Sequence, residues 1–309
     1  MLLEDLMQFI ASDDERTTVE MRNGHKVHFY PTDKIRIPVD KNAVIRNKVV
    51  SPHLNDSIVA NIDIDLKGDP IYINRLMMLD IVANNNWKRP IYFTGGAFAD
   101  EDFIWMKDYL QLDGLVYKLV PIKTPLGEQA SPLDMGHIDT EKMYNIVTKW
   151  DWGNSESPDI YHDPETRKNS ITYRTNLARL MEALINEGKK DKAKTIIDLA
   201  MTKMPIDYFG YYTFVEPFAG GYYEVGEKAK AREVLNQLMK KYQENLTYYA
   251  GMKPTEQNEL YMDISTDIER YRSLLHIMKD RGDLEFYNQN KTKFNNFNKL
   301  FERFGRDME

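Results

Sequence analysis

One pattern of apolar residues occurs twice in the second half of the chain, 38 residues apart, as the turn glycines Gly188 and Gly226 show. On both sides of each glycine the apolar residues recur at intervals of three and four, the spacing of one helix face. The positions are Leu177, Leu180, Met181, Leu184, Ile185, Ala193, Ile196, Ile197, Ala200 and Met201, then Val215, Phe218, Ala219, Tyr222, Tyr223, Ala231, Val234, Leu235, Leu238 and Met239. Each helix pair leaves one face uncovered, so this half has to fold by stacking pairs on one another.

The paired helices resemble the tetratricopeptide repeat (TPR), in which a turn glycine is followed by a small residue that opens the second helix. Ala193 and Ala231 occupy that position, and Pro205 ends the first copy. The spacing departs from the usual period of about 34 residues, and Gln243 stands where the first copy has Pro205. We therefore expect the extra residues to lengthen the link between the repeats.

Independent stability of such an array requires about three units, and the sequence offers a less regular third pair. Residues 264–278 and 284–304 have helical spacing, and the second of these segments is rich in phenylalanine. The helical pattern as a whole begins at Ile171. The sequence thus predicts an all-α, TPR-like array of helical hairpins over residues 160–309.

The first half of the chain alternates short strand-like segments with helical ones. Asn23-Gly24, between two alternating segments, predicts a β-hairpin with a type I′ turn. Strands that alternate with helices predict parallel crossovers, and hence an α+β or α/β domain with a small mixed sheet over residues 1–155. The other expected strands are 35–39, 58–66, 90–94 and 115–120, and the expected helices are 2–10, 73–83 and 102–110.

Composition excludes several classes of function. The net charge is −7, so the chain lacks the basic surface of a nucleic-acid-binding protein. It contains no cysteine, which excludes disulfides, thiolate catalysis and cysteine-based zinc sites. No segment is long and apolar enough for a transmembrane helix. The sequence predicts a soluble chain without a cofactor.

Asp63 and Asp65 form a D-x-D pair of the kind that holds a metal and a diphosphate in many sugar-nucleotide transferases. Carboxylates two residues apart on a strand point to the same side, which coordination could use. The alternative is the solvent face of an alternating strand, because short motifs recur freely. We prefer the solvent-face interpretation, and keep the pair as the candidate for a metal.

A loop after the predicted helix over 73–83 combines amide, aromatic and cationic groups in Asn86, Trp87, Lys88 and Arg89. Such a loop could bind a sugar or peptide by stacking and hydrogen bonding. The alternative is a helix C-terminal cap with the indole in the core. Further candidates for contact with a ligand lie in the repeats, where aromatic and polar groups can line a groove. They are Arg174, Asn176, Tyr208 and Tyr212.

Several longer stretches resemble one family. They are NNNWKRPIYFTGG, DYLQLDGLVYKLVP, YRTNLARLMEALINEGKKDKAKTIIDLAMTKMP and GGYYEVGEKAKAREVL. They resemble the C-terminal region of domain-of-unknown-function family 2723 (DUF2723), whose members are large Bacteroidetes membrane proteins similar to protein O-mannosyltransferases of the GT-C class. The resemblance runs across nearly the whole chain. It implies a tail on the periplasmic side of the inner membrane. Catalysis is expected in a multi-span part that this sequence lacks, so no catalytic residue is carried over.

The resulting hypothesis is a non-catalytic accessory tail. It would bind protein, peptide or glycan of the cell envelope through the repeat groove and the loop around Trp87. One alternative is a sugar-nucleotide- or metal-dependent enzyme in the first half, using Asp63 and Asp65. Another is a structural domain that packs on its own upstream membrane part.

Overall fold

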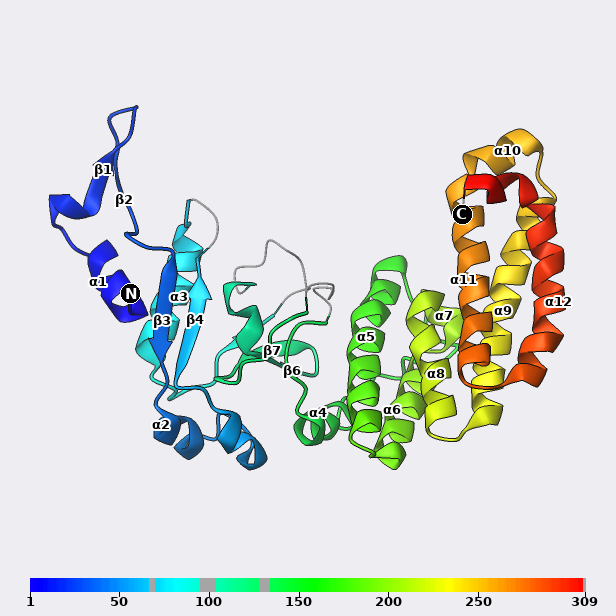
Figure 1. Ribbon diagram of the computed structural model, residues 1–309, viewed down its shortest axis with the longest axis horizontal. Coiled ribbons are helices and arrows are strands. Elements are labelled where there is room, and N and C mark those ends of the chain that lie inside the picture. Colours follow the sequence, from blue (N-terminus) through cyan, green and yellow to red (C-terminus); the bar gives the residue numbers. More distant parts are fainter. Residues whose placement is uncertain (67–69, 95–103, 128–133, 308–309) are drawn as a thin grey trace. The chain divides into compact units, whose positions relative to one another are not determined.

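The computed structural model describes residues 1–66, 70–94, 104–127 and 134–307, and Figure 1 shows its helices and strands. Contacts within the chain divide it into two compact units, Met1–Val147 and Thr148–Glu309. The first unit holds short sheets and helices, and the second is an all-helical array. This arrangement confirms the predicted fold class. The division falls between Val147 and Thr148, before the boundary over residues 155–160 that the sequence predicts.

The described part of the second unit contains three helical hairpins, and in each of them the same type of turn joins the two helices. The turn glycines Gly188, Gly226 and Gly282 have φ of 75°, 84° and 72°, where a side chain would be strained. After each glycine, the next N–H donates at 2.8 Å to the carbonyl five residues earlier. The hairpins are α5 (Pro164–Asn186) with α6 (Lys190–Lys203), α8 (Glu216–Glu224) with α9 (Lys228–Ala250), and α11 (Tyr261–Asp280) with α12 (Leu284–Leu300). The predicted third pair is confirmed.

Helix α5 begins earlier than its apolar pattern, which starts at Ile171. The carboxylate of Asp163 accepts hydrogen bonds from the N–H groups of Glu165, at 2.9 Å, and Thr166, at 3.1 Å. Pro164 occupies the first helical position, where no N–H donor is needed. A capped start therefore adds almost two turns to the helix that the apolar spacing alone predicts.

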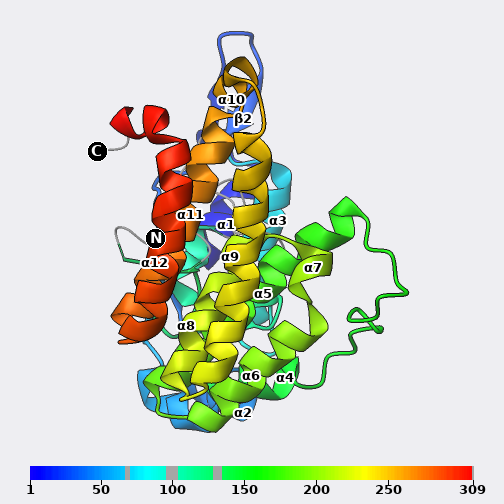
Figure 2. The same cartoon turned by 90° about the vertical axis from the view of Figure 1, so that its right-hand side faces the viewer.

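The helices of the second unit pack in chain order. Helix α5 lies on α6 and α8 on α9, while α9, α11 and α12 lie side by side (Figure 2). The repeated apolar positions form the core, and all of them are buried except Ile185, Met201 and Tyr223, which are half-buried. Each buried aliphatic or aromatic side chain contributes about 1.5–3 kcal/mol relative to exposure, so this stripe drives the stacking.

The links between the hairpins contain short helices of their own. The first link carries α7 (Ile206–Phe209) and the 3-10 turn η5 (Tyr212–Val215). The second carries α10 (Pro254–Glu259), and the 3-10 turn η6 (Glu302–Asp307) follows α12. The extra residues of the 38-residue period therefore lie in a longer link, as predicted.

The described part of the first unit holds three small antiparallel sheets. Strand β1 (Thr18–Glu20) pairs with β2 (Lys26–His28), β3 (Lys34–Pro38) pairs with β4 (Asn61–Asp65), and β7 (Val116–Leu119) lies between β5 (Tyr92–Phe93) and β6 (Leu110–Asp113). The predicted parallel crossovers are wrong. Residues 110–113 form a strand instead of continuing a helix, and a tight turn at Gly114, with φ of 76°, folds β7 back against β6.

The core of the first unit lies between the β3–β4 pair and the helices α1 (Leu3–Ile10) and α3 (Ile73–Asn85). Alternate residues of both strands, such as Ile35 and Ile62, are buried, whereas their neighbours are exposed. Of the helix predicted over 102–110, the described part is the 3-10 helix η3 (Ile104–Tyr109). The remaining elements are α2 (Lys41–Arg46), the 3-10 helix η2 (Pro52–Ser57) and α4 (Thr140–Val147).

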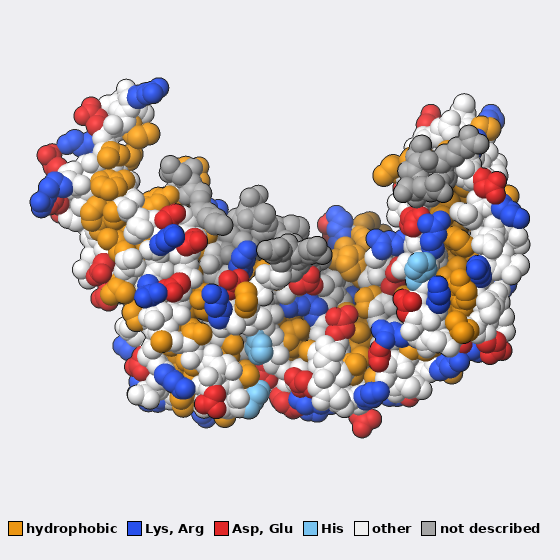
Figure 3. Space-filling model, in the orientation of Figure 1, with side chains coloured by type: hydrophobic (Ala, Val, Ile, Leu, Met, Phe, Trp, Pro, Cys, Tyr) orange, Lys and Arg blue, Asp and Glu red, His pale blue; other side chains and the backbone are white. Residues whose placement is uncertain are grey.

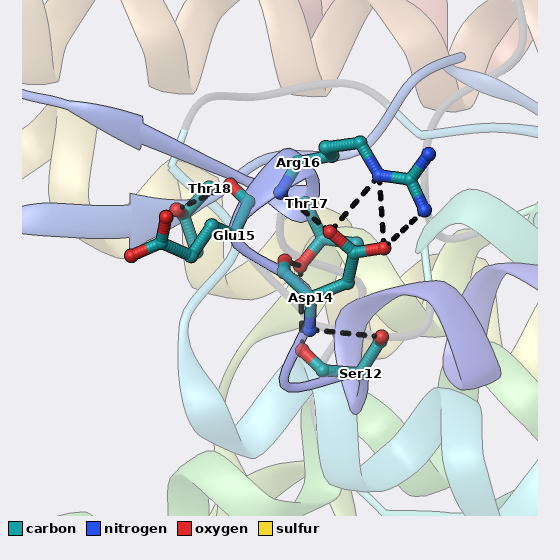
Figure 4. Close-up of polar contacts among 6 residues, drawn as sticks. All are labelled: Ser12, Asp14, Glu15, Arg16, Thr17 and Thr18. Carbon is teal, nitrogen blue, oxygen red and sulfur yellow. Dashed lines mark hydrogen bonds and ion pairs between the residues drawn. The ribbon is translucent and has the colours of Figure 1, made fainter.

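Asp14 organises the turn before the β1–β2 hairpin, where η1 (Glu15–Thr17) lies (Figure 4). Its carboxylate accepts the N–H of Arg16 at 2.9 Å and also binds the Arg16 guanidinium. This guanidinium holds the pKa of Asp14 down at about 2. This local ion pair therefore stabilises the turn on an exposed surface.

The β1–β2 hairpin closes with a turn other than the predicted type I′. Gly24 has φ of 80°, whereas Asn23 is not in the left-handed region, and the carbonyl of Met21 accepts the N–H of Gly24 at 2.8 Å. A three-residue loop of this kind needs one left-handed residue, which the glycine supplies. Val19, Met21 and Val27 are exposed, and Figure 3 shows apolar side chains gathered over this part of the surface.

Candidate functional site

A groove of about 520 Å³ crosses the first helices of the three hairpins, and we call it the hairpin groove. Its apolar lining comes from α5, α8 and α11, and consists of Met181, Ile185, Pro217 and Ile277. Its charged lining consists of Glu182, Glu216, Glu224, Asp280 and Arg281. The guanidinium of Arg281 is paired with the carboxylate of Glu224. The groove is thus a partly apolar surface with an excess of negative charge.

Glu216 is the buried acid of the hairpin groove, with 8% of its surface exposed. Its Oε2 accepts a hydrogen bond from the Ser273 hydroxyl at 2.9 Å, whereas its Oε1 is buried without a hydrogen-bond partner. Burial raises the pKa of Glu216, and the Ser273 hydrogen bond and the charge of Arg270 oppose that rise. A buried carboxylate oxygen without a donor costs about 1–3 kcal/mol, so the fold alone does not account for it.

Two consecutive glycines in α8 shape the groove beside Glu216. A Cβ on Gly221 would lie 2.2 Å from Sδ of Met181, so only glycine lets α8 approach α5 this closely. A Cβ on Gly220 would meet only the Arg281 guanidinium, at 3.9 Å. Gly220 therefore leaves room for a methyl group beside Arg281.

The structure places Arg174 inside the helical unit, which corrects the expectation that it faces the groove. Its guanidinium donates to the carbonyls of Met204, at 2.9 Å, and Gly210, at 2.5 Å. Only 1% of the residue is exposed, and burial lowers its pKa to about 10. Arg174 therefore supplies hydrogen-bond donors to two carbonyls of the long link between the first two hairpins.

The other repeat candidates have different surroundings. Asn176 is buried in α5, which corrects its expected position in a groove. Tyr208 is half-buried and lines a separate hollow of about 320 Å³ with Asp207. Tyr212 is half-buried, and its ring meets that of Tyr242 edge to face, with centroids 6.2 Å apart. The structure brings none of these described side chains into the set that lines the hairpin groove.

The loop around Trp87 is a helix C-terminal cap, as in the second interpretation of the sequence. Asn86 and Trp87 both have left-handed backbone, with φ of 48° and 57°. Trp87 is buried, and its carbonyl accepts the Asn47 side-chain amide at 2.9 Å, whereas Lys88 and Arg89 are exposed. A cavity of about 260 Å³ lies beside the indole. Trp87 is thus a wall of the core rather than a free stacking platform.

Asp63 and Asp65 both lie on the exposed face of β4. Arg36 on β3 binds the Asp63 carboxylate at 2.6 Å, and this ion pair lowers the pKa of Asp63. In residues 1–66, 70–94, 104–127 and 134–307, no three His, Asp or Glu side chains come together where they could hold a metal ion. The pair therefore has the surroundings expected of a strand's solvent face.

A buried polar cluster in the first unit has no counterpart among the sequence predictions. The ammonium of Lys118 donates to the carbonyl of Val49, and burial together with the charge of Lys142 lowers the pKa of Lys118 to about 8. Asp113 binds Lys142 at 2.5 Å and accepts the Gln111 amide at 2.7 Å. Through these contacts the cluster joins α4 and the segment around Val49 to the β5–β7–β6 sheet. The period-two alternation of the strands was its only sequence signal.

Comparison with known proteins gives one match. Residues 1–142 match the family model described as TMEM260-associated domain 2, which covers less than half of the chain and lies within the first unit. The match does not name DUF2723, although both descriptions concern membrane proteins. No curated protein and no solved structure matches the chain. In the part of the chain that the structure describes, each helix is too short or too polar to cross a bilayer.

Proposed function

We propose that this chain is a non-catalytic accessory module of a membrane glycosyltransferase-like protein, displayed on the periplasmic face of the inner membrane. The match of residues 1–142 to a TMEM260-associated domain supports the membrane-protein context. The resemblance of longer stretches to DUF2723 supports the transferase context. The chain's own part in this function is recognition.

The helical unit is the recognising part, and its ligand is a segment of polypeptide held in the hairpin groove. One observation carries this proposal: the groove crosses helices of three successive hairpins and offers apolar and charged side chains together. An extended segment of several residues fits such a surface, because stacked helix pairs present a continuous face. Apolar anchors supply contact area, and the charged lining supplies selectivity.

Variants at Gly220 test the proposal. The full chain is applied to an array of 12-residue peptides of mixed composition, as wild type, Gly220→Ala and Gly220→Leu. A methyl group at this position meets little, whereas a leucine side chain extends into the groove. We expect Gly220→Ala to bind the same peptides as wild type and Gly220→Leu to lose them. Equal binding by Gly220→Leu, or signals only on a parallel glycan array, would contradict the proposal.

A further inference from the structure

We infer that the hairpin groove selects polypeptide segments by a lysine or arginine side chain, which Glu216 binds at the floor of the groove. This inference rests on the proposed function of the groove and names the chemistry of its ligand. It follows from an unmatched oxygen, the charge of the groove lining and the glycine that lies one turn along α8 from Glu216.

The unmatched oxygen is Oε1 of Glu216. The Ser273 hydroxyl occupies the other oxygen at 2.9 Å, and the side chain is thereby held in place. Oε1 itself is buried and accepts nothing within the protein. An incoming donor lowers the free energy of such a buried oxygen more than that of an exposed carboxylate, because the buried oxygen has already lost its water during folding. The missing partner is a hydrogen-bond donor.

The charge of the lining decides which donor fits. Glu182, Glu224 and Asp280 line the same groove as Glu216, and Arg281 is engaged by Glu224. The charge of Arg270 also reaches Glu216. A carboxylate or phosphate on the ligand would be repelled here. A neutral amide would satisfy Oε1 but would gain nothing from the negative charge of the lining. An ammonium or guanidinium donates to Oε1 and also matches the field of the lining.

Access to Glu216 comes from the glycine pair in α8. Gly220 follows Glu216 by four residues and so lies on the same face of the helix, one turn further on. Gly220 itself adds no side chain over the carboxylate. Oε1 is covered in the free chain, so a neighbouring side chain must move aside before a ligand reaches it. The apolar side chains of Ile185 and Ile277 flank the groove on α5 and α11. These apolar side chains can pack against the aliphatic stem of a lysine or arginine and against the neighbouring residues of the polypeptide. A free amine has no such neighbouring residues.

Peptides captured by the full chain provide the test. Each is resynthesised with lysine replaced by acetyl-lysine and arginine by glutamine, and its affinity is measured for wild type, Glu216→Gln and Glu244→Gln. Glu244 carries the same charge but is exposed on α9, outside the groove. We expect a loss of at least about tenfold for Glu216→Gln and for the neutralised peptides. Glu244→Gln should bind like wild type.

These binding measurements show whether Glu216 has no role in binding or whether the groove binds no polypeptide at all. If Gly220→Leu abolishes binding but Glu216→Gln does not, the groove binds polypeptide and the role of Glu216 is overturned. An equal loss in Glu244→Gln would mean general charge attraction and would also overturn it. Spermidine that binds as tightly as the peptides would show that a free amine suffices. If Gly220→Leu binds the peptides as wild type does, the proposed function itself is contradicted. A stable Glu216→Gln chain by circular dichroism excludes misfolding as the cause of lost binding.

Discussion

Gly220→Ala and Gly221→Ala are adjacent changes in one helix for which the structure predicts opposite effects on stability. Replacing a helix glycine by alanine gains about 0.5–1 kcal/mol, because the unfolded chain loses conformational freedom. At Gly220 the new methyl group meets only an arginine terminus at 3.9 Å, so the gain should be realised. At Gly221 the Cβ would lie 2.2 Å from Sδ of Met181 and 3.1 Å from Cδ1 of Ile197.

Overpacking of this kind costs about 1–3 kcal/mol, since buried neighbours must leave their rotamers or the helices must separate. After the helix gain is subtracted, Gly221→Ala should destabilise the chain by about 0.5–2 kcal/mol, and Gly220→Ala should stabilise it by about 0.5–1 kcal/mol. Urea denaturation of the full chain, followed by far-UV circular dichroism, measures both changes in the transition of the helical unit.

Met181 provides the matched background for this test. In a Met181→Ala chain the closest contact of the new methyl group is gone, so Gly221→Ala should cost much less there than in wild type. The effect of Gly220→Ala should be the same in both backgrounds, because its Cβ does not approach Met181. A Gly221→Ala chain as stable as wild type would show that α5 and α8 separate freely, and would refute the close-packing argument.

Three further predictions concern buried charges. Glu216→Gln should raise stability by about 1 kcal/mol near pH 8. Burial raises the pKa of Glu216, so its ionised form destabilises the fold and this gain should vanish as the pH falls toward 4.5. Arg174→Met should cost about 2–4 kcal/mol in urea denaturation, because the link carbonyls lose their donors; a smaller loss than in Arg167→Met would contradict this. Asp283, whose pKa Arg232 holds well below its usual range, stabilises at neutral pH. Asp283→Asn should cost about 2–4 kcal/mol there, and thermal unfolding should show the difference shrinking below pH 3.8.

Local pattern predicted the helical unit well because helix formation and turn chemistry depend on neighbours in the sequence. The spacing around Gly188 and Gly226 placed both hairpins, and the longer period placed the link between them. Most strands of the first unit were found as segments, but β6 was missed, and apart from the β1–β2 hairpin their pairing was not predicted. Pairing depends on where a connection turns the chain, and Gly114 decided it for β6 and β7.

The candidate contact residues show the limit of reasoning from residue type. Arg174 and Trp87 are side chains that often bind ligands, yet one serves backbone carbonyls and the other caps a helix at the edge of the core. Glu216 escaped notice because an acid in an amphipathic helix is ordinary. The signal that could have found it was Gly220-Gly221, two glycines inside a helical pattern, which mark a close approach or an open face.

In the helical unit, the sequence by itself determined which segments form the paired helices, which face of each helix is apolar and where each pair turns, since these follow from propensities and periodicities of a few neighbouring residues. Only the tertiary structure decided which polar groups found partners. Arg174 meets carbonyls 30 and 36 residues away in sequence, and Oε1 of Glu216 is buried without a donor. Whether a buried charge is satisfied depends on side chains brought together from different helices, and no local pattern specifies that meeting.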